Sequence, residues 1–339
     1  MTKSDQTPPK RKGDLVRILP GLIISIAAVA ILTSLVNLQD LVRDVRAADY
    51  RYLILATVLF LVSLVARAYG WRAIMQDKIS LSRTFWTMNE GYFLNNVLPF
   101  RMGEIGRALL LDRTTRISFW EALPTIVIER IIDVAFSAGI LLVSLPYIVG
   151  AEDSQQIAYI VIGFVAIGFL ILFSVVRNKN AVLRWFDKSA SRWTLLHKFG
   201  RERLASLLEG ASALSDLKRF LRVLFWMGSF WGLTILLFYA LLLAFVPEAK
   251  LVWASFSLGA LAMGVATPAS PGNIGVYEIV LAGALQLVGI PISLAVSFAV
   301  VAHSLFLVFT LSFGGYALKR DGTSLFELYR QLRSRSTKI

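Results

Sequence analysis

Several apolar runs in this chain are long enough to cross a lipid bilayer, and they constrain the fold more than any other feature. They cover about residues 18–36, 50–69, 119–148, 157–176, 221–245 and 292–318. A helix needs about 20 mostly apolar residues to cross the hydrocarbon layer, and these runs reach about that length. They do not alternate apolar and polar residues as the strands of a membrane β-barrel do. The sequence therefore predicts an all-α polytopic membrane protein with six full spans.

The distribution of charge predicts how these spans are oriented. The formal net charge is +13, and the basic residues gather in the tail 1–17, the segment 177–220 and the tail 321–339. Basic segments tend to stay on the cytoplasmic side of a membrane. We therefore expect a multi-pass protein of the cell membrane with both tails in the cytoplasm. The segment 177–220 is expected to form amphipathic helix on the same face.

Two segments that share one motif interrupt the helical pattern. P-x-x-x-G-x-I-G occupies residues 99–106 and again residues 268–275, an offset of 169 positions. Proline ends a helix and glycine loosens the following turn. The helical stretches on either side are short for a crossing, so we expect two re-entrant hairpins, about residues 84–111 and 251–288. In the alternative, both hairpins cross fully, which would bring Arg101 near the outer face.

The same offset aligns the hydropathy of two halves, about residues 18–148 and 157–318, within one transmembrane domain, 18–320. Each half has three crossings and one hairpin. An odd number of crossings inverts the second half, so the hairpins enter from opposite faces and their tips can meet near the midplane. Inverted repeats with broken helices are a recurring design of secondary transporters. The sequence therefore predicts an inverted internal repeat.

Three charged residues lie inside the third run. Glu129, Arg130 and Asp133 are roughly 15–21 Å into it, close to the middle of the bilayer. Their spacing places them on one helix face. A buried charge there costs about 3 kcal/mol or more, so such residues pair or face a cavity. The competing interpretations are a polar route for substrate and a structural ion pair between helices.

The first hairpin tip is rich in polar side chains. We expect Asn95, Asn96, Arg101, Glu104 and Arg107 to contribute to substrate binding. Arginine binds phosphate through two parallel hydrogen bonds, and the exposed amides of a broken helix add to this. An anionic lipid headgroup is a natural ligand. The alternative is that the arginines are cytoplasmic charges that orient the protein.

The second tip also carries polar side chains, and one histidine lies in the last run. The tip residues are Ser270, Asn273, Tyr277 and Glu278. We expect them to bind substrate, although the segment can also be explained as a rigid turn. His303 lies near the midplane and is a candidate to relay a proton or to pair with Asp133. The competing interpretation of His303 is a packed core residue.

Other kinds of chemistry have little support in the sequence. The chain has no cysteine and two histidines, which leaves little for a metal site. It has no nucleotide-binding P-loop, no aspartate-rich prenyl-transfer motif and no histidine-bearing phosphatase pattern. We therefore expect a protein that is not an enzyme and has no cofactor, metal or nucleic-acid partner.

Three polar motifs in this order resemble a known family. They are Asn95-Asn96 with Pro99, Arg101, Gly103-Glu104 and Arg107; then Glu129-Arg130 with Asp133; then Pro268, Ser270-Pro271-Gly272 and Gly275 with Tyr277-Glu278. Over about residues 15–320 the chain resembles the flippase-like transmembrane domain of bacterial lysylphosphatidylglycerol synthetase/flippases. The resemblance implies movement of a lipid with a polar headgroup between leaflets. Only about twenty residues follow the last run, so we expect a stand-alone member without the aminoacyl-transfer domain.

Three hypotheses follow. The first is a flippase for a phospholipid or a polyprenyl-phosphate-linked lipid with a polar, anionic headgroup. The second is a non-catalytic membrane partner of a lipid-linked glycosyltransferase or lipid synthase. In either case the candidate partners are a second copy of the chain, in a homo-oligomer, and a lipid-modifying enzyme. The third is a membrane enzyme that uses Glu104, Glu129 and Asp133, and it ranks last because these carboxylates lack a recognisable set of catalytic partners.

Overall fold

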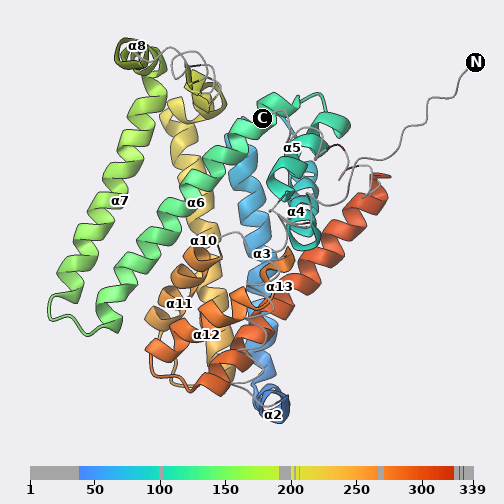
Figure 1. The fold of residues 1–339 in the computed structure, drawn as a ribbon, viewed down its shortest axis with the longest axis vertical. Helices are drawn as coiled ribbons and strands as arrows, with labels where there is room; N and C mark the ends of the chain where they lie inside the picture. The colour runs from blue at the N-terminus through green and yellow to red at the C-terminus, as the bar shows by residue number, and fades with distance from the viewer. Residues whose placement is uncertain are drawn as a thin grey trace, which may run out of the picture.

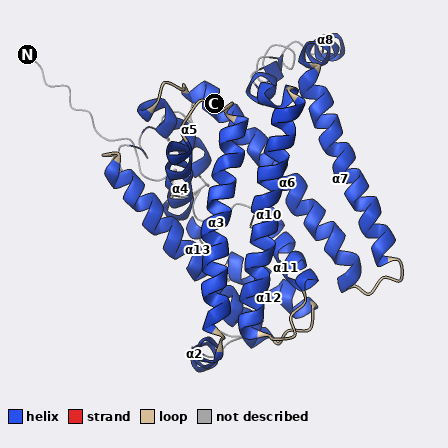
Figure 2. Ribbon diagram, turned by 180° about the vertical axis from the view of Figure 1, so that it is seen from behind, coloured by secondary structure: helices blue, strands red, loops and turns tan. Residues whose placement is uncertain are grey.

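A computed structural model describes residues 38–98, 102–190, 200–201, 204–205, 207–265, 271–323, 328 and 331. Its regular structure is helical throughout these residues (Figure 1; Figure 2). The helices are α2 (Leu38–Ala47), α3 (Tyr50–Ile74), α4 (Leu81–Val97), α5 (Gly103–Thr114), α6 (Phe119–Ile148), α7 (Ser154–Arg177), α8 (Lys179–Ala190), η2 (Ala211–Ser215), α10 (Leu217–Phe245), α11 (Leu251–Gly264), η3 (Pro271–Asn273), α12 (Val276–Leu287) and α13 (Ile292–Arg320). The expected first span, 18–36, and the site residues Arg101 and Ser270 lie outside the described residues.

Four helices are long and apolar enough to cross a membrane: α3, α7, α10 and α13. They coincide with four of the six predicted spans. The fifth, α6, has 30 residues and so exceeds the thickness of the hydrocarbon layer, but it carries the charged residues Glu129, Arg130 and Asp133. Four of the six predicted spans are therefore confirmed as helices that are long and apolar enough to cross a membrane.

Local sequence signals explain where these helices begin and end. Ser80, Ser118 and Asp216 cap α4, α6 and α10, because each side chain accepts a hydrogen bond from a backbone N–H in the first turn. Helix α4 ends at Val97, and its C-cap residue Leu98 is extended, as expected for the residue before a proline. The break after α4 thus follows from Pro99 in the sequence.

The two interrupted segments each form a pair of short helices. Helices α4 and α5 pack against each other, as do α11 and α12. Helix α4 has 17 residues and the other three have 12 to 14, so each is shorter than a typical bilayer crossing. The α4–α5 pair lies toward the upper end of the bundle in Figure 1 and the α11–α12 pair toward the lower end. Turn η3, which precedes α12, packs against α4.

The centre of the bundle is the long contact between α3 and α10, and two further contacts flank it. Helix α4 packs on α13, and α11 packs on α6. The α4–α13 contact is close, since a Cβ atom on Gly314 would collide with the Asn89 carbonyl oxygen. Asn96 Nδ2 also donates to Thr310 Oγ1 over 2.8 Å. Helices α6 and α7 form the outer edge, and most of α7 is exposed (Figure 1).

An ion pair joins the other end of the α4–α13 contact. The guanidinium group of Arg83 on α4 donates to Asp321, which follows α13, and Arg320 donates to the same carboxylate over 3.1 Å. Burial by itself raises the pKa of Asp321, but the hydrogen bonds from Arg83 and Arg320 outweigh it and lower the pKa. The carboxylate is therefore ionised at neutral pH and holds the two helices together.

Candidate functional site

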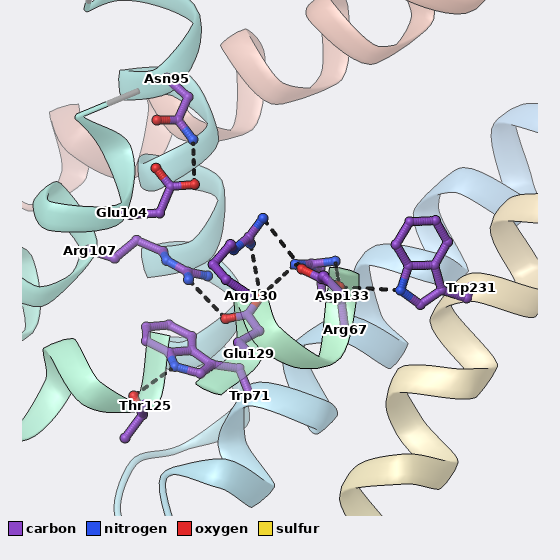
Figure 3. A network of polar contacts seen from close by, with 10 residues as sticks. All are labelled: Arg67, Trp71, Asn95, Glu104, Arg107, Thr125, Glu129, Arg130, Asp133 and Trp231. Carbon is purple, nitrogen blue, oxygen red and sulfur yellow. Dashed lines mark hydrogen bonds and ion pairs between the residues drawn. The ribbon is translucent and has the colours of Figure 1, made fainter. Parts of the chain in front are cut away.

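Five charged side chains from three helices form one buried network (Figure 3). Glu129 on α6 lies at its centre, because Arg67 Nη2 is 2.6 Å from its Oε1 and Arg107 Nη2 is 2.8 Å from its Oε2. Arg67 Nη2 also lies 2.5 Å from Asp133 Oδ2. Arg130 completes the network through Glu129, at 3.2 Å, and Asp133, at 3.4 Å.

The network has more positive than negative charge. Three guanidinium groups face two carboxylates, which leaves one surplus positive charge if all five are ionised. Three of the donor atoms have no hydrogen-bond partner among the described residues: Nε of Arg67, Nη1 of Arg107 and Nε of Arg130. An anion placed here would meet unused charge and unused hydrogen-bond donors.

Exposure separates one member of the network from the rest. The side chains of Arg67, Arg107 and Glu129 are at most 4% exposed, and Asp133 is 11% exposed. Arg130 is 35% exposed. Arg130 is therefore the cation of this network that a ligand can reach most easily, while the others hold it in place.

Aromatic side chains pack against two arginines of the network and donate a hydrogen bond to Asp133. Phe230 lies under the Arg67 guanidinium group, and Trp71 lies under that of Arg107, each with the cation 4.4 Å from the ring centre. Trp71 Nε1 in turn donates to Thr125 Oγ1 over 3.2 Å. Trp231 Nε1 donates to Asp133 Oδ1 over 3.2 Å. The network is thus fixed by α3 and α10 as well as by α6.

The first hairpin tip lies beside this network. Asn95 Oδ1 accepts a hydrogen bond from Gly103 N over 2.7 Å, and Asn95 Nδ2 donates to Glu104 Oε1 over 3.4 Å (Figure 3). Asn95 therefore closes the break between α4 and α5. The close approach requires glycine, because a Cβ atom at Gly103 would collide with the Gly91 carbonyl oxygen.

The second tip forms a separate polar pair. His303 Nδ1 on α13 is 2.6 Å from Glu278 Oε1 on α12, and Glu278 Oε2 accepts from Gly275 N over 2.7 Å. The Tyr277 ring stacks on His303 with 4.1 Å between ring centres. The expected pairing of His303 with Asp133 is wrong in this structure, because Glu278 occupies the Nδ1 side of the ring.

A cleft of about 490 Å³ lies between these polar sites. Its walls are mostly apolar, with aromatic and leucine side chains from α3, α10, α11 and α13. The polar residues that line it include six of the predicted site residues: Glu104, Arg130, Asp133, Asn273, Tyr277 and His303. The predicted residues Asn95, Asn96, Arg107, Glu129 and Glu278 are not among its lining residues. Glu129 pairs with the cleft-lining Arg130, Arg107 pairs with Glu129, and Glu278 pairs with the cleft-lining His303.

Sequence reasoning missed Arg67 as a site residue. The second apolar run ends at about residue 69, so Arg67 lies near its end in the sequence. The structure continues α3 to Ile74, so Arg67 lies inside the helix and is buried. An arginine within the helical pattern, with Trp71 one turn later, is the signal that could have identified it. Among the described residues, no group of three or more His, Asp and Glu side chains is placed to hold a metal ion.

Comparison with known proteins identifies the family. Residues 18–314 match the family described as the lysylphosphatidylglycerol synthase TM region. The chain belongs to this family. Together with the four apolar spans, the match makes this a membrane protein and confirms the resemblance seen in the sequence motifs.

Curated relatives come from archaea. The chain is 24% identical to Glycosyltransferase AglD of Haloferax volcanii over 78% of its own length and 48% of the relative's. It is 24% identical to the UPF0104 membrane protein MJ1595 of Methanocaldococcus jannaschii over 49% of its own length and 52% of the relative's. The chain thus spans about half the length of these two relatives. It is also 23% identical to the UPF0104 membrane protein PH1989 of Pyrococcus horikoshii, over 81% and 89% of the two lengths. No solved structure matches the chain.

Proposed function

We propose that this protein is a flippase that moves a lipid with an anionic headgroup between the leaflets of the cell membrane. The cleft is the observation that carries this proposal. It has apolar walls for acyl or prenyl chains and an accessible cation, Arg130, at one polar end. A phospholipid or a polyprenyl-phosphate-linked lipid has the same division into chain and charged headgroup.

The surplus charge of the network favours an anionic headgroup over a neutral one. Arg130 already shares Glu129 and Asp133 with Arg67 and Arg107, so its own charge is incompletely neutralised. A phosphate oxygen in the cleft would form charge-assisted hydrogen bonds with the guanidinium group, which are about twice as strong as neutral ones. The same phosphate is costly in the apolar membrane interior without such a partner.

The arrangement of helices supports two re-entrant hairpins in an inverted repeat. The 169-residue offset relates α3 to α10, α4 to α11 and α6 to α13. Under this relation the contact of α4 with α13 is equivalent to that of α11 with α6, and α3 with α10 is its own equivalent. Turn η3 packs against α4, so parts of the two tips lie together. Alternating opening of the two halves around the cleft would expose the headgroup first to one leaflet and then to the other.

The distribution of charge predicts how the protein is oriented in the membrane. Helix α8 and the start of α6 lie at the upper end in Figure 1, and the connection between α6 and α7 lies at the lower end. We place the upper end in the cytoplasm, since α8 belongs to the basic segment 177–220. Both tails are then cytoplasmic as well.

Reconstitution tests the function directly. The purified protein is placed in vesicles with fluorescent phosphatidylglycerol, and the lipid that reaches the outer leaflet is measured by quenching from outside. We expect movement above that of empty vesicles, and slower movement of fluorescent phosphatidylcholine. Arg130→Gln should slow phosphatidylglycerol by about 10- to 100-fold, since a hydrogen bond to a charged group contributes about 1.5–3 kcal/mol.

The matched control is Arg43→Gln, because the Arg43 side chain on α2 is 69% exposed and is not among the residues that line the cleft. This variant should transport as the wild type does. If neither phosphatidylglycerol nor a polyprenyl phosphate moves, or if Arg130→Gln and Arg43→Gln behave alike, the flippase proposal is wrong.

A second candidate is a non-catalytic membrane partner of a lipid-linked glycosyltransferase or lipid synthase. The observation that favours it is the similarity to about half of a relative named as a glycosyltransferase. The segment 177–220 would then be a docking surface. Recovery of such an enzyme with the purified protein, together with function that is insensitive to Arg130→Gln, would favour this candidate over the flippase.

A further inference from the structure

The pair Glu278–His303 is a titratable site that the binding of a headgroup at Arg130 does not by itself require. Both side chains are buried, with exposures of 10% for Glu278 and 3% for His303. Nδ1 of His303 faces Glu278 at 2.6 Å. Its Nε2 has no hydrogen-bond partner among the described residues, and His303 lines the cleft. A ring nitrogen is therefore available to a proton that arrives through the cleft.

The surroundings of this pair are poor in other charges. Helix α11, which packs on α12, contains no ionisable residue. Asp44 on α2 contacts α13 at Ser297. The other titratable or charged side chains of the cleft wall are Tyr277 beside the pair, Tyr92 on α4 and, with the first polar site, Arg67, Glu104, Arg130 and Asp133. A proton gained or lost by the pair therefore changes the charge of this part of the cleft by one unit.

The charge of the whole site explains why such a proton matters. Counted as ionised, the five groups at Arg130 have one surplus positive charge, and the carboxylates of Glu104 at the cleft wall and of Glu278 beside the neutral His303 ring add two negative charges. Arg130 attracts an anionic headgroup locally, but the headgroup raises the negative charge of the whole site by one, in a medium where an unbalanced charge is costly. One proton on His303 Nε2 offsets this added charge.

We propose that Glu278 and His303 form a proton-binding site that makes this protein a proton-coupled transporter, in which one proton moves with each anionic headgroup. The proton from one side binds His303 Nε2 while Nδ1 remains hydrogen-bonded to Glu278. It leaves from the same atom to water on the other side when the headgroup departs. This inference rests on the proposed function and adds its driving force. His303 is the proton carrier, and Glu278 is a positioning residue that fixes its ring and stabilises the imidazolium.

Vesicles with an imposed pH gradient test the coupling. With fluorescent phosphatidylglycerol, the wild type should move lipid faster toward the alkaline side than toward the acidic side, and a trapped pH dye should report proton flow that requires the lipid. His303→Gln preserves a hydrogen bond to Glu278 but cannot carry the charge. It should slow lipid movement without a gradient, because the headgroup then moves without a compensating proton, and the movement that remains should not respond to the gradient. His197→Gln, at the chain's other histidine, is the control and should keep it.

The outcomes separate the two proposals. Lipid movement by the wild type that ignores the pH gradient would overturn proton coupling and leave the flippase standing. No lipid movement at all would overturn the flippase. Binding in detergent would then test whether a headgroup and a proton bind together. There, soluble short-chain phosphatidylglycerol should cause uptake of roughly one proton per lipid bound in weak buffer near pH 7. Phosphatidylcholine and His303→Gln should give none, and equal uptake by His303→Gln or no uptake by the wild type would overturn the proposal.

Discussion

At the scale of single residues, the structure divides the charged network between support and contact. Glu129 is fully buried and pairs with three arginines. Arg130 keeps part of its surface free in the cleft. A buried ion pair is costly to break, because the remaining partner keeps its charge without compensation. Stability and transport should therefore depend on different members of the same network.

Glu129→Gln tests this division. It should lower the free energy of unfolding by about 3–5 kcal/mol, because Arg67 and Arg107 lose their common counter-charge in the interior. Thermal unfolding in detergent checks this value. Arg130→Gln is the comparison and should change stability by about 1 kcal/mol or less, since its side chain is partly exposed and its partners keep other cations. Equal destabilisation by the two variants would contradict the assignment of Arg130 as the contact residue.

At the scale of helices, the fold depends on close packing between α4 and α13. Gly314→Ala should destabilise the protein by about 1–3 kcal/mol, because the new methyl group collides with the Asn89 carbonyl oxygen. Gly168→Ala on α7 is the matched control, since nothing lies within 4 Å of its added Cβ atom, and it should be neutral or stabilise by up to about 1 kcal/mol. Unfolding in detergent measures both, and the reverse order would argue against this helix contact.

The helices themselves could largely be predicted from the sequence, because apolar length and Pro99 are local signals. The partners of individual side chains could not. Whether His303 faces Asp133 or Glu278 depends on how α12 packs on α13, which no local pattern specifies. Arg67 was not identified for a related reason, since the apolar run ends near it while the helix continues to Ile74. The grouping of Glu129, Arg130 and Asp133 on one face was predictable, because helix periodicity alone determines it.

At the scale of the whole molecule, the charge distribution and the proposed inverted repeat predict which surfaces face the cytoplasm. The chain has no cysteine, so a maleimide labels the purified chain only at a cysteine that is introduced. A membrane-impermeant maleimide added to intact cells should label Leu287→Cys, since Leu287 is 71% exposed at the end of α12. It should leave Thr114→Cys and Arg101→Cys unlabelled until the membrane is opened. Outside labelling of Arg101→Cys would favour hairpins that cross fully, and outside labelling of Thr114→Cys would invert the orientation.

In the proposed function, the cleft holds a lipid by its anionic headgroup at Arg130. The most direct measurement is mass spectrometry of the lipids that remain with the protein when it is purified gently from its membrane. We expect the wild type and Arg43→Gln to retain an anionic phospholipid or a polyprenyl phosphate, enriched over the membrane from which they came, and Arg130→Gln to lose it. Retention of a zwitterionic lipid instead, or equal retention of the anionic lipid by Arg130→Gln, would contradict the account.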